Sequence, residues 1–401
     1  MFVVIILLSM TCPSGGMVVG LIDEVVVRTM VVISSLVMMW VCLSSKSRQV
    51  LLIASVVYFM SILMFTVDSV FWMFVWFESS MVPMALIVTM TGVQFERMSA
   101  CAYMIVYTVV FGSVFILAMF FSGLESVDLD LDKSLSLSST GEKGAVFAMS
   151  LAFLMKIPMF MLHPWLPKAH LESGVTGSIL LAGVLLKMGV YGMIQLLMGF
   201  GDMKWDSVFL TVSLMGIVYT SWLSLSSSDV KMTVAYSSVS HMNFVLAVLL
   251  TGVSSCIYSV LITSLCHSVV SVILFSFVTA LYEMTGSRSY VVSKGSSSLD
   301  SPMRWGNYVF WTLNMCLPPT MCFTGEVMLI LSAAKYNPLS VVIVLGGVFM
   351  MSCVCVVNCI VLQHETNKPL LKKNAILWPI LGGGVWGTCL AMLFFGSDMT
   401  M

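Results

Sequence analysis

The chain has 401 residues, of which 59% are hydrophobic and only 9% are charged, and its formal net charge is -1. A soluble domain carries roughly 25% charged residues, so the composition indicates a polytopic membrane protein. The apolar runs are long and do not alternate, which excludes a transmembrane β-barrel. The sequence has no basic patch that would suggest a nucleic-acid partner, and no Walker A or Rossmann glycine motif.

Hydropathy divides the chain into about thirteen candidate spans. The first is interrupted by Pro13, Gly15 and Gly16. It has no basic region before it and no clear cleavage site, so we expect a retained span and no signal peptide. The predicted cores are 2–22, 25–44, 50–67, 69–92, 101–122, 145–164, 175–199, 207–227, 231–252, 255–281, 305–333, 338–362 and 376–396.

Charges in the connecting loops predict the orientation. Loops with an excess of Lys and Arg face the inner, negative compartment. With thirteen spans, the loops after residue 44, at 282–304 and at 363–375 are basic and fall on one side. The acidic loops at 23–24, 123–144 and 200–206 fall on the other. We therefore expect the N-terminus inside and the C-terminus outside.

The segment 147–191 contains two apolar runs, each with a lysine near its middle, Lys156 and Lys187. A lysine at the bilayer centre costs about 2.5–3.5 kcal/mol on insertion scales, and such residues typically mark ion or proton pathways. Pro158 follows Lys156 closely and predicts a break or kink in the helix.

Other ionisable residues lie within or beside the apolar runs. For the central charged groups, the alternatives are a proton-carrying role and a structural ion pair between helices. A histidine can also simply satisfy a neighbouring hydroxyl, and Lys231 can snorkel or pair with Asp229. His163 and His170 lie in a polar turn, where a surface loop is the simpler interpretation. The principal candidates are Glu78, Lys156, Lys187, His241, His267 and Glu326, and the secondary ones are Lys231, His163 and His170.

Two predicted spans share an unusual feature, because prolines interrupt both near a charged residue. Pro158 follows Lys156, and Pro318–Pro319 precede Glu326, five spans later. Five spans per repeat would invert the second copy in the membrane, and paired broken helices in inverted halves point to a transport site. Backbone groups freed by such a break must face protein or water.

The eleven cysteines contain no C-x-x-C motif. The apolar run that holds Cys353, Cys355 and Cys359 does not place three ligands on one helical face. We therefore expect free cysteines that act as small hydrophobic residues, and no metal, haem or iron–sulfur cofactor in this chain.

Several motifs resemble a known family. FLMKIPMFMLHPWLPKAHLESGVTGSILLAGVLLKMGVYG, WFESSMVPMALIVTMTGVQFER, VAYSSVSHMNF, YEMTGSRS and LPPTMCFTGE are similar to segments of the antiporter-like, proton-pumping subunits of NADH:ubiquinone oxidoreductase (respiratory complex I). The LPKAH and LLKMGVYG stretches resemble the chain 4 family more than chains 2 and 5. The resemblance covers about Phe71 to Glu326 and continues weakly to the C-terminus.

The resemblance implies fourteen helices, two inverted five-helix repeats, two broken helices and a central line of polar residues that includes the six principal candidates. Too little sequence precedes Glu78 for the four helices usual in the family, so we expect that one N-terminal helix is missing. The expected divisions are N-terminal helices at 1–49, a first repeat at 50–199, a second at 200–362 and a C-terminal helix at 363–401. The small, weakly charged chain resembles an organelle-encoded protein of the mitochondrial inner membrane, with basic loops on the matrix side.

The resemblance implies a proton-translocating subunit whose partners are lipid and other membrane-arm subunits, including the chain 2 and chain 5 paralogues. NADH, FMN, iron–sulfur clusters and ubiquinone would then bind elsewhere in the complex. Lys187 would exchange protons with the bundle centre, and Glu78 and Lys156 would form a switchable ion pair. The alternatives are a cation/proton antiporter subunit of the same fold, for which only Glu78 and Glu326 supply intramembrane carboxylates, and a scaffold that does not transport.

Overall fold

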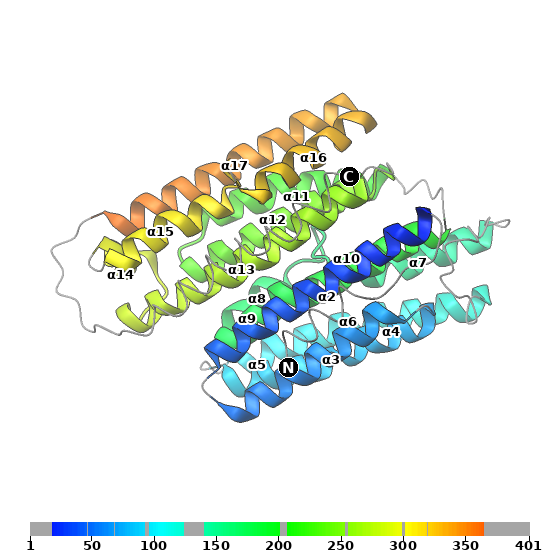
Figure 1. Cartoon of the computed structure of the whole chain (residues 1–401), viewed down its shortest axis with the longest axis horizontal. Coiled ribbons are helices and arrows are strands. Elements are labelled where there is room, and N and C mark those ends of the chain that lie inside the picture. The colour runs from blue at the N-terminus through cyan, green and yellow to red at the C-terminus, as the bar shows by residue number, and fades with distance from the viewer. Residues whose placement is uncertain are drawn as a thin grey trace.

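A computed structural model gives the fold of residues 18–45, 47–67, 69–92, 96–123, 140–200, 207–252, 256–298, 301–318 and 320–364. In these residues the regular elements are helices, most of which run roughly along a common direction (Figure 1). Their bounds are α2 Val18–Ser44, α3 Arg48–Thr66, α4 Val70–Ser79, α5 Met81–Thr91, α6 Arg97–Ser122, α7 Thr140–Lys156, α8 Trp165–Glu172, α9 Val175–Leu180, the π-helix η2 Leu181–Leu185, α10 Leu186–Phe200, α11 Ser207–Ser226, α12 Val230–Leu249, α13 Cys256–Thr285, α14 Tyr290–Ser293, the short 3₁₀ helix η3 Ser296–Ser298, α15 Ser301–Asn314, α16 Met321–Tyr336 and α17 Pro338–Gln363.

The prediction of an all-helical membrane protein is confirmed. Nine helical stretches among the described residues are long and apolar enough to cross a membrane. The predicted span at 376–396 and most of the one at 2–22 lie outside the described residues. The missing N-terminal helix stays an expectation for the same reason.

The N-terminal part differs from the prediction at one point. We expected a loop at residues 23 and 24 between two spans, but α2 begins at Val18 and continues through both residues to Ser44. The sequence from Val18 to Ser44 contains no proline, and its only glycine is Gly20. Two adjacent acidic residues do not interrupt backbone hydrogen bonding as proline does, so the helix continues through them.

The first predicted break is present. Helix α7 ends at Lys156, and a turn leads to α8, which begins at Trp165. Pro158 has no backbone N–H and cannot continue the helical ladder. The Trp165 indole nitrogen donates a hydrogen bond of 3.1 Å to the carbonyl of Met155, one of the carbonyls at the broken helix end. This carbonyl at the break is thus hydrogen-bonded inside the protein, as a membrane environment requires.

The second predicted break is also present. Helix α15 ends at Asn314 and α16 begins at Met321, with Pro318 in the connection. Cys316 has a φ of 52°, a left-handed conformation that is uncommon for a residue with a side chain. The prediction that the helices holding Lys156 and Glu326 are discontinuous is therefore confirmed at both sites.

Burial separates the central helices from the outer ones. In the most apolar window of Val175–Phe200 all residues are buried, and 83% are buried in the corresponding windows of α12 and α13, against 33% for α6 and α17. Lys187, His241 and His267 lie on the central helices. The bundle therefore shields these polar groups from lipid, which is what ionisable residues in a membrane require.

Described helix ends that flank the loops predicted to be basic lie at one end of the bundle. The backbone N–H of Gly295, in the connection after α13, donates to the carbonyl of Val361 near the end of α17. Figure 1 shows the C-terminal end of α2 at this same, left-hand end. This arrangement agrees with the predicted sidedness of the loops after residue 44, at 282–304 and after α17.

Candidate functional site

Lys187 is buried at the centre of the bundle, with a side chain that is only 1% exposed. It follows the π-helix η2, in which hydrogen bonds run over five residues in place of four. The Lys187 ammonium itself donates to the carbonyl of Ala182, five residues earlier, at 2.8 Å. Short π segments occur frequently at functional sites, and this one gives a buried lysine a backbone acceptor.

His267 on α13 is the second partner of Lys187. Its Nδ1 atom lies 2.9 Å from Lys187 Nζ. A charged lysine only donates, so Nδ1 must accept and the proton of the neutral ring must reside on Nε2. The ring of His241 on α12 follows, with its centroid 5.8 Å from that of His267.

His241 leads in turn to the carboxyl group of Glu326. The His241 Nδ1 and Glu326 Oε1 atoms are 3.5 Å apart, and both side chains are largely buried. Glu326 lies on α16, just beyond the second break, which places it opposite α12. Lys187, His267, His241 and Glu326 therefore form a line of neighbouring polar groups across four helices.

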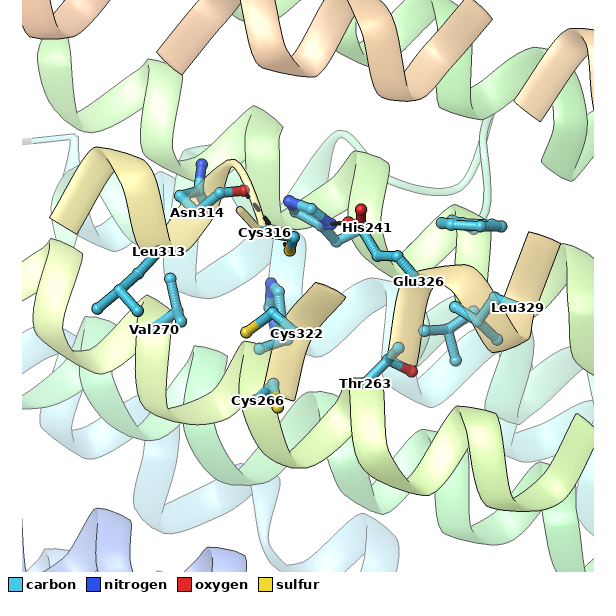
Figure 2. A pocket seen from close by; sticks show the side chains of 13 residues that line it. His241, Thr263, Cys266, Val270, Leu313, Asn314, Cys316, Cys322, Glu326 and Leu329 are labelled. Carbon is cyan, nitrogen blue, oxygen red and sulfur yellow. Dashed lines mark hydrogen bonds and ion pairs between the residues drawn. The ribbon is translucent and has the colours of Figure 1, made fainter. Parts of the chain in front are cut away.

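Two cavities adjoin the end of this line, and His241, Phe244, Asn314 and Glu326 line both. They offer about 30 and 20 Å³ to the centres of water molecules, whereas about 10–15 Å³ suffices to hold one water. Figure 2 shows His241 and Glu326 pointing toward each other in the larger cavity. Water can therefore reach the His241–Glu326 pair and solvate its protonation changes.

Lys156 is the last residue of α7 and is 1% exposed. Its ammonium donates to the carbonyl of Phe77 at 2.7 Å and lies 3.1 Å from the centroid of the Phe77 ring. A carbonyl and an aromatic face both stabilise a cation. The break after α7 therefore presents the lysine to the last turns of α4.

Glu78 follows Phe77 but its carboxyl group turns toward α6. A Cβ atom at Gly112 would lie 3.3 Å from Glu78 Cδ, so glycine leaves the room that the carboxylate occupies. Within the described residues the structure contains no ion pair between Glu78 and Lys156. The predicted ion pair is thus not formed in this conformation, in which the Phe77 carbonyl accepts the hydrogen bond from the Lys156 ammonium.

Lys156 and Lys187 belong to two helices that pack closely. A Cβ atom at Gly189 on α10 would lie 3.4 Å from Lys156 Cβ and 2.9 Å from a side-chain carbon of Ile157. Glycine at this position lets α10 approach the broken end of α7.

Lys231 has a structural position that sequence reasoning did not foresee. Its ammonium donates to the carbonyl of Ser173 at 2.6 Å and reaches that of Leu171 at 3.5 Å. Arg288 also donates to the Leu171 carbonyl, at 2.8 Å. Cations at a helix C-terminus satisfy its last carbonyls and favour its dipole, so Lys231 caps α8; it neither snorkels to the surface nor pairs with Asp229.

The two histidines of the broken segment are enclosed, and neither belongs to a polar surface loop. His163 is 8% exposed and stacks on Phe160, with ring centroids 5.6 Å apart. His170 is fully buried and stacks on Phe275 at 4.5 Å. Among the described residues neither ring nitrogen of His170 has a hydrogen-bond partner.

Asn243 is a residue that sequence reasoning missed. Its side-chain oxygen accepts from the Phe160 backbone N–H at 3.1 Å, and its nitrogen donates to the Pro158 and Val239 carbonyls at 3.0 and 2.9 Å. The amide therefore satisfies both sides of the first break from α12. The only signal in the sequence is a lone amide within the apolar run 242–250, one turn from Val239 and two residues from His241.

Comparisons with known proteins agree with this geometry. The family model described as NADH:quinone oxidoreductase/Mrp antiporter, TM, matches residues 67–352. A NADH-ubiquinone oxidoreductase chain 4 of Rhipicephalus sanguineus is 33% identical over 315 residues, which cover 78% of this chain and 71% of that one.

Solved structures show the same fold. A chain of respiratory complex I from Thermus thermophilus with bound NADH matches with a TM-score of 0.76 at 19% identity and covers 97% of this chain and 88% of its own. A chain of the Mrp complex from a Dietzia species matches with a TM-score of 0.76 at 15% identity, with coverages of 88% and 68%. At these identities the two structures establish the fold alone.

Proposed function

Because the chain belongs to the NADH:quinone oxidoreductase/Mrp antiporter family of membrane proteins, we propose that it is a proton-translocating membrane-arm subunit of NADH:ubiquinone oxidoreductase. The observation that carries the proposal is the buried line from Lys187 through His267 and His241 to Glu326. Ionisable residues are costly and rare inside a membrane. Packing alone therefore does not explain four of them in one line.

The contacts suit stepwise proton transfer. Lys187 can pass a proton to His267 Nδ1 within their existing contact of 2.9 Å. The proton on His267 Nε2 then leaves toward His241, and the gap between the rings requires a water molecule or a ring rotation. His241 and Glu326 complete the line beside two cavities that admit water. Histidine suits this relay because its unperturbed pKa lies closest to neutrality.

Lys156 and Glu78 supply the switch in this proposal. With the Lys156 ammonium on the Phe77 carbonyl, Glu78 is turned toward Gly112. Rotation of the Glu78 side chain would bring the carboxylate to the ammonium and hold the proton on Lys156, since a nearby opposite charge favours the charged form. Release of the carboxylate would let the proton move toward Lys187. The energy of this step comes from redox chemistry elsewhere, because each charge moved against the membrane potential costs about 2.3 kcal/mol per 100 mV.

The proposal extends to the arrangement around the chain. The broken helices would belong to two inverted five-helix repeats, at 50–199 and 200–362. Partners would be the other membrane-arm subunits, including the chain 2 and chain 5 paralogues, with NADH, FMN, iron–sulfur clusters and ubiquinone bound to other chains. The location would be the mitochondrial inner membrane, and the end of the bundle that holds Gly295 would face the matrix. Homologues named as chain 4 of NADH-ubiquinone oxidoreductase support the assignment to this complex.

The test is NADH-driven proton translocation by the assembled complex in sealed vesicles. Lys187→Met should abolish translocation through this chain while the abundance of the complex stays unchanged. Lys143→Met is the matched control, because Lys143 is exposed near the start of α7. Full translocation in Lys187→Met would refute the proposal. Translocation that depends on sodium ions and not on NADH would favour the cation/proton antiporter alternative.

A further inference from the structure

Three cysteines from three separate segments meet beside the His241–Glu326 pair. Cys266 lies on α13, Cys316 in the second break and Cys322 in the first turn of α16. All three line the larger cavity, and Figure 2 shows them grouped between α13 and the break. The structure thus places three thiols next to the carboxylate at the end of the polar line.

The Cys322 thiol occupies the middle of this group. Figure 2 shows its side chain between those of Cys266 and Cys316. Glu326 lines the same cavity as all three thiols. Cys322 and Glu326 are four residues apart on α16 and therefore lie on the same helical face. The thiols and the carboxylate form one connected cluster.

The backbone around the cluster favours one pair of thiols over the other. Disulfides require a narrow range of Cα–Cα distances and side-chain directions. Cys266 lies in the middle of the 30-residue helix α13, where the backbone has little freedom to adjust. Cys316 lies in the connection after α15 with a φ of 52°, and one bond from its N–H to the Leu313 carbonyl, at 3.1 Å, replaces the continuous hydrogen-bond ladder of a helix. Cys316 is therefore the partner that can adjust to Cys322.

We propose that the cavity is an oxidation site in which hydrogen peroxide converts Cys316 and Cys322 into an intramolecular disulfide. Cys322 attacks first, since a helix N-terminus favours the thiolate. Its sulfur bonds to one peroxide oxygen, the O–O bond breaks, and the products are a sulfenic acid and one water. The Cys316 sulfur then displaces the hydroxyl as a second water and forms the S–S bond. The two thiols lose two electrons and two protons, and the peroxide accepts them.

The disulfide has a consequence for the transport site, which rests on the proposed function. It would tie the connection before α16 to the first turn of that helix, one turn from Glu326. The carboxyl group would then lose the freedom to change its distance from His241. Oxidation should therefore stop proton movement through the end of the line, and reduction should restore it.

The chemical test uses the intact complex, treated with hydrogen peroxide, alkylated and digested with trypsin. Residues 305–335 form one tryptic peptide that contains both Cys316 and Cys322, whereas Cys266 lies in the peptide 232–288. The expected product is the peptide 305–335 with a mass lower by two hydrogens and resistant to alkylation until reduced. A link between the two peptides, or two free thiols in 305–335 after treatment, would overturn the proposal.

Variants separate the disulfide from general oxidation. Cys322→Ser and Cys316→Ser should each abolish the mass change. Because either variant alone tests the disulfide, the experiment still gives a result if the other variant fails to assemble. Cys101→Ser should not affect it, since Cys101 lies on α6 against the Ala85 carbonyl. Peroxide should reduce proton translocation reversibly in the unmodified complex and not in Cys316→Ser. Disulfide formation without this difference would overturn the inhibitory consequence, while the effect of Lys187→Met tests the proposed function separately.

Discussion

Lys187 Nζ and His267 Nδ1 lie 2.9 Å apart, although 80 positions separate the two residues in the sequence. The contact joins α10 to α13, and both side chains are buried. A lysine that keeps its proton holds the histidine nitrogen as an acceptor; a lysine that gives its proton to that nitrogen makes the ring a donor toward His241. A proton transfer from Lys187 to His267 at this contact therefore allows His267 to donate its other proton toward His241.

Lys187→Arg tests whether the lysine must release its proton. Arginine keeps the positive charge and can still donate to the Ala182 carbonyl, but the guanidinium does not deprotonate in proteins. We expect an assembled complex in which NADH-driven proton translocation through this chain falls to background. Translocation and abundance are measured together, with Lys143→Arg as the control. Normal translocation in Lys187→Arg would mean that the lysine acts only through its charge.

Glu78 and Lys156 should act as one unit. We expect Lys156→Ala and Glu78→Gln each to depress turnover and proton translocation with assembly preserved, because in this conformation Lys156 already has the Phe77 carbonyl as a partner. The double variant should then be little worse than the more damaging single one, since groups that act together are not additive.

A structural ion pair would behave differently from this switch. Removing one partner of a buried pair destabilises by about 3–5 kcal/mol, and removing both relieves the unpaired charge. Proton pumping and abundance of the complex distinguish the two cases for the same three variants. Single variants that lose assembly, together with a double variant that recovers assembly and pumping, would show that the pair only holds the bundle together.

Asn243 should stabilise the first break. In Asn243→Leu the Phe160 N–H and the Pro158 carbonyl lose their partners, and each unsatisfied buried group costs about 1–3 kcal/mol. We expect a lower thermal stability of the complex and easier proteolysis between α7 and α8. Ser213→Ala is a suitable control, because the Ser213 hydroxyl bonds only to the Leu210 carbonyl of its own helix. An unchanged melting temperature in Asn243→Leu would contradict the role assigned to the amide.

Lys231 should matter for assembly more than for transport. Lys231→Met removes a cap from the end of α8 and should lower the abundance of the complex, while each remaining complex pumps normally. Lys231→Arg should restore abundance, since arginine also donates to carbonyls at a helix C-terminus. Pumping per complex is obtained from translocation divided by abundance. A loss of pumping at normal abundance would instead assign Lys231 to the proton path.

The breaks and the buried charges were predictable because their causes are local. Pro158 and Pro318 interrupt helices wherever the chain folds, and charges within long apolar runs must turn inward. The predicted spans between residues 25 and 362 therefore correspond to helical segments of the structure. The prediction of a loop at 23–24 was wrong, because two charged residues alone do not end a helix.

The partners of each candidate were not predictable in the same way, because they depend on packing between distant segments. The Phe77 carbonyl, and not Glu78, receives Lys156 in this conformation, and carbonyls of α8 receive Lys231. Every residue has a main-chain carbonyl, so the sequence does not show which carbonyl will accept a hydrogen bond from a given lysine. The π-helix before Lys187 and the amide of Asn243 escaped prediction for the same reason, since both become meaningful only once α10 and α12 are placed against their neighbours.

Proton translocation by complexes that carry His241→Gln or Glu326→Gln tests the central claim most directly, because these residues end the line that starts at Lys187. Glutamine retains hydrogen-bonding capacity in both cases but does not titrate. We predict that both variants assemble normally and lose NADH-driven proton translocation through this chain, with turnover depressed in parallel. Unchanged translocation in both variants, at normal abundance, would show that the line from Lys187 to Glu326 does not carry protons.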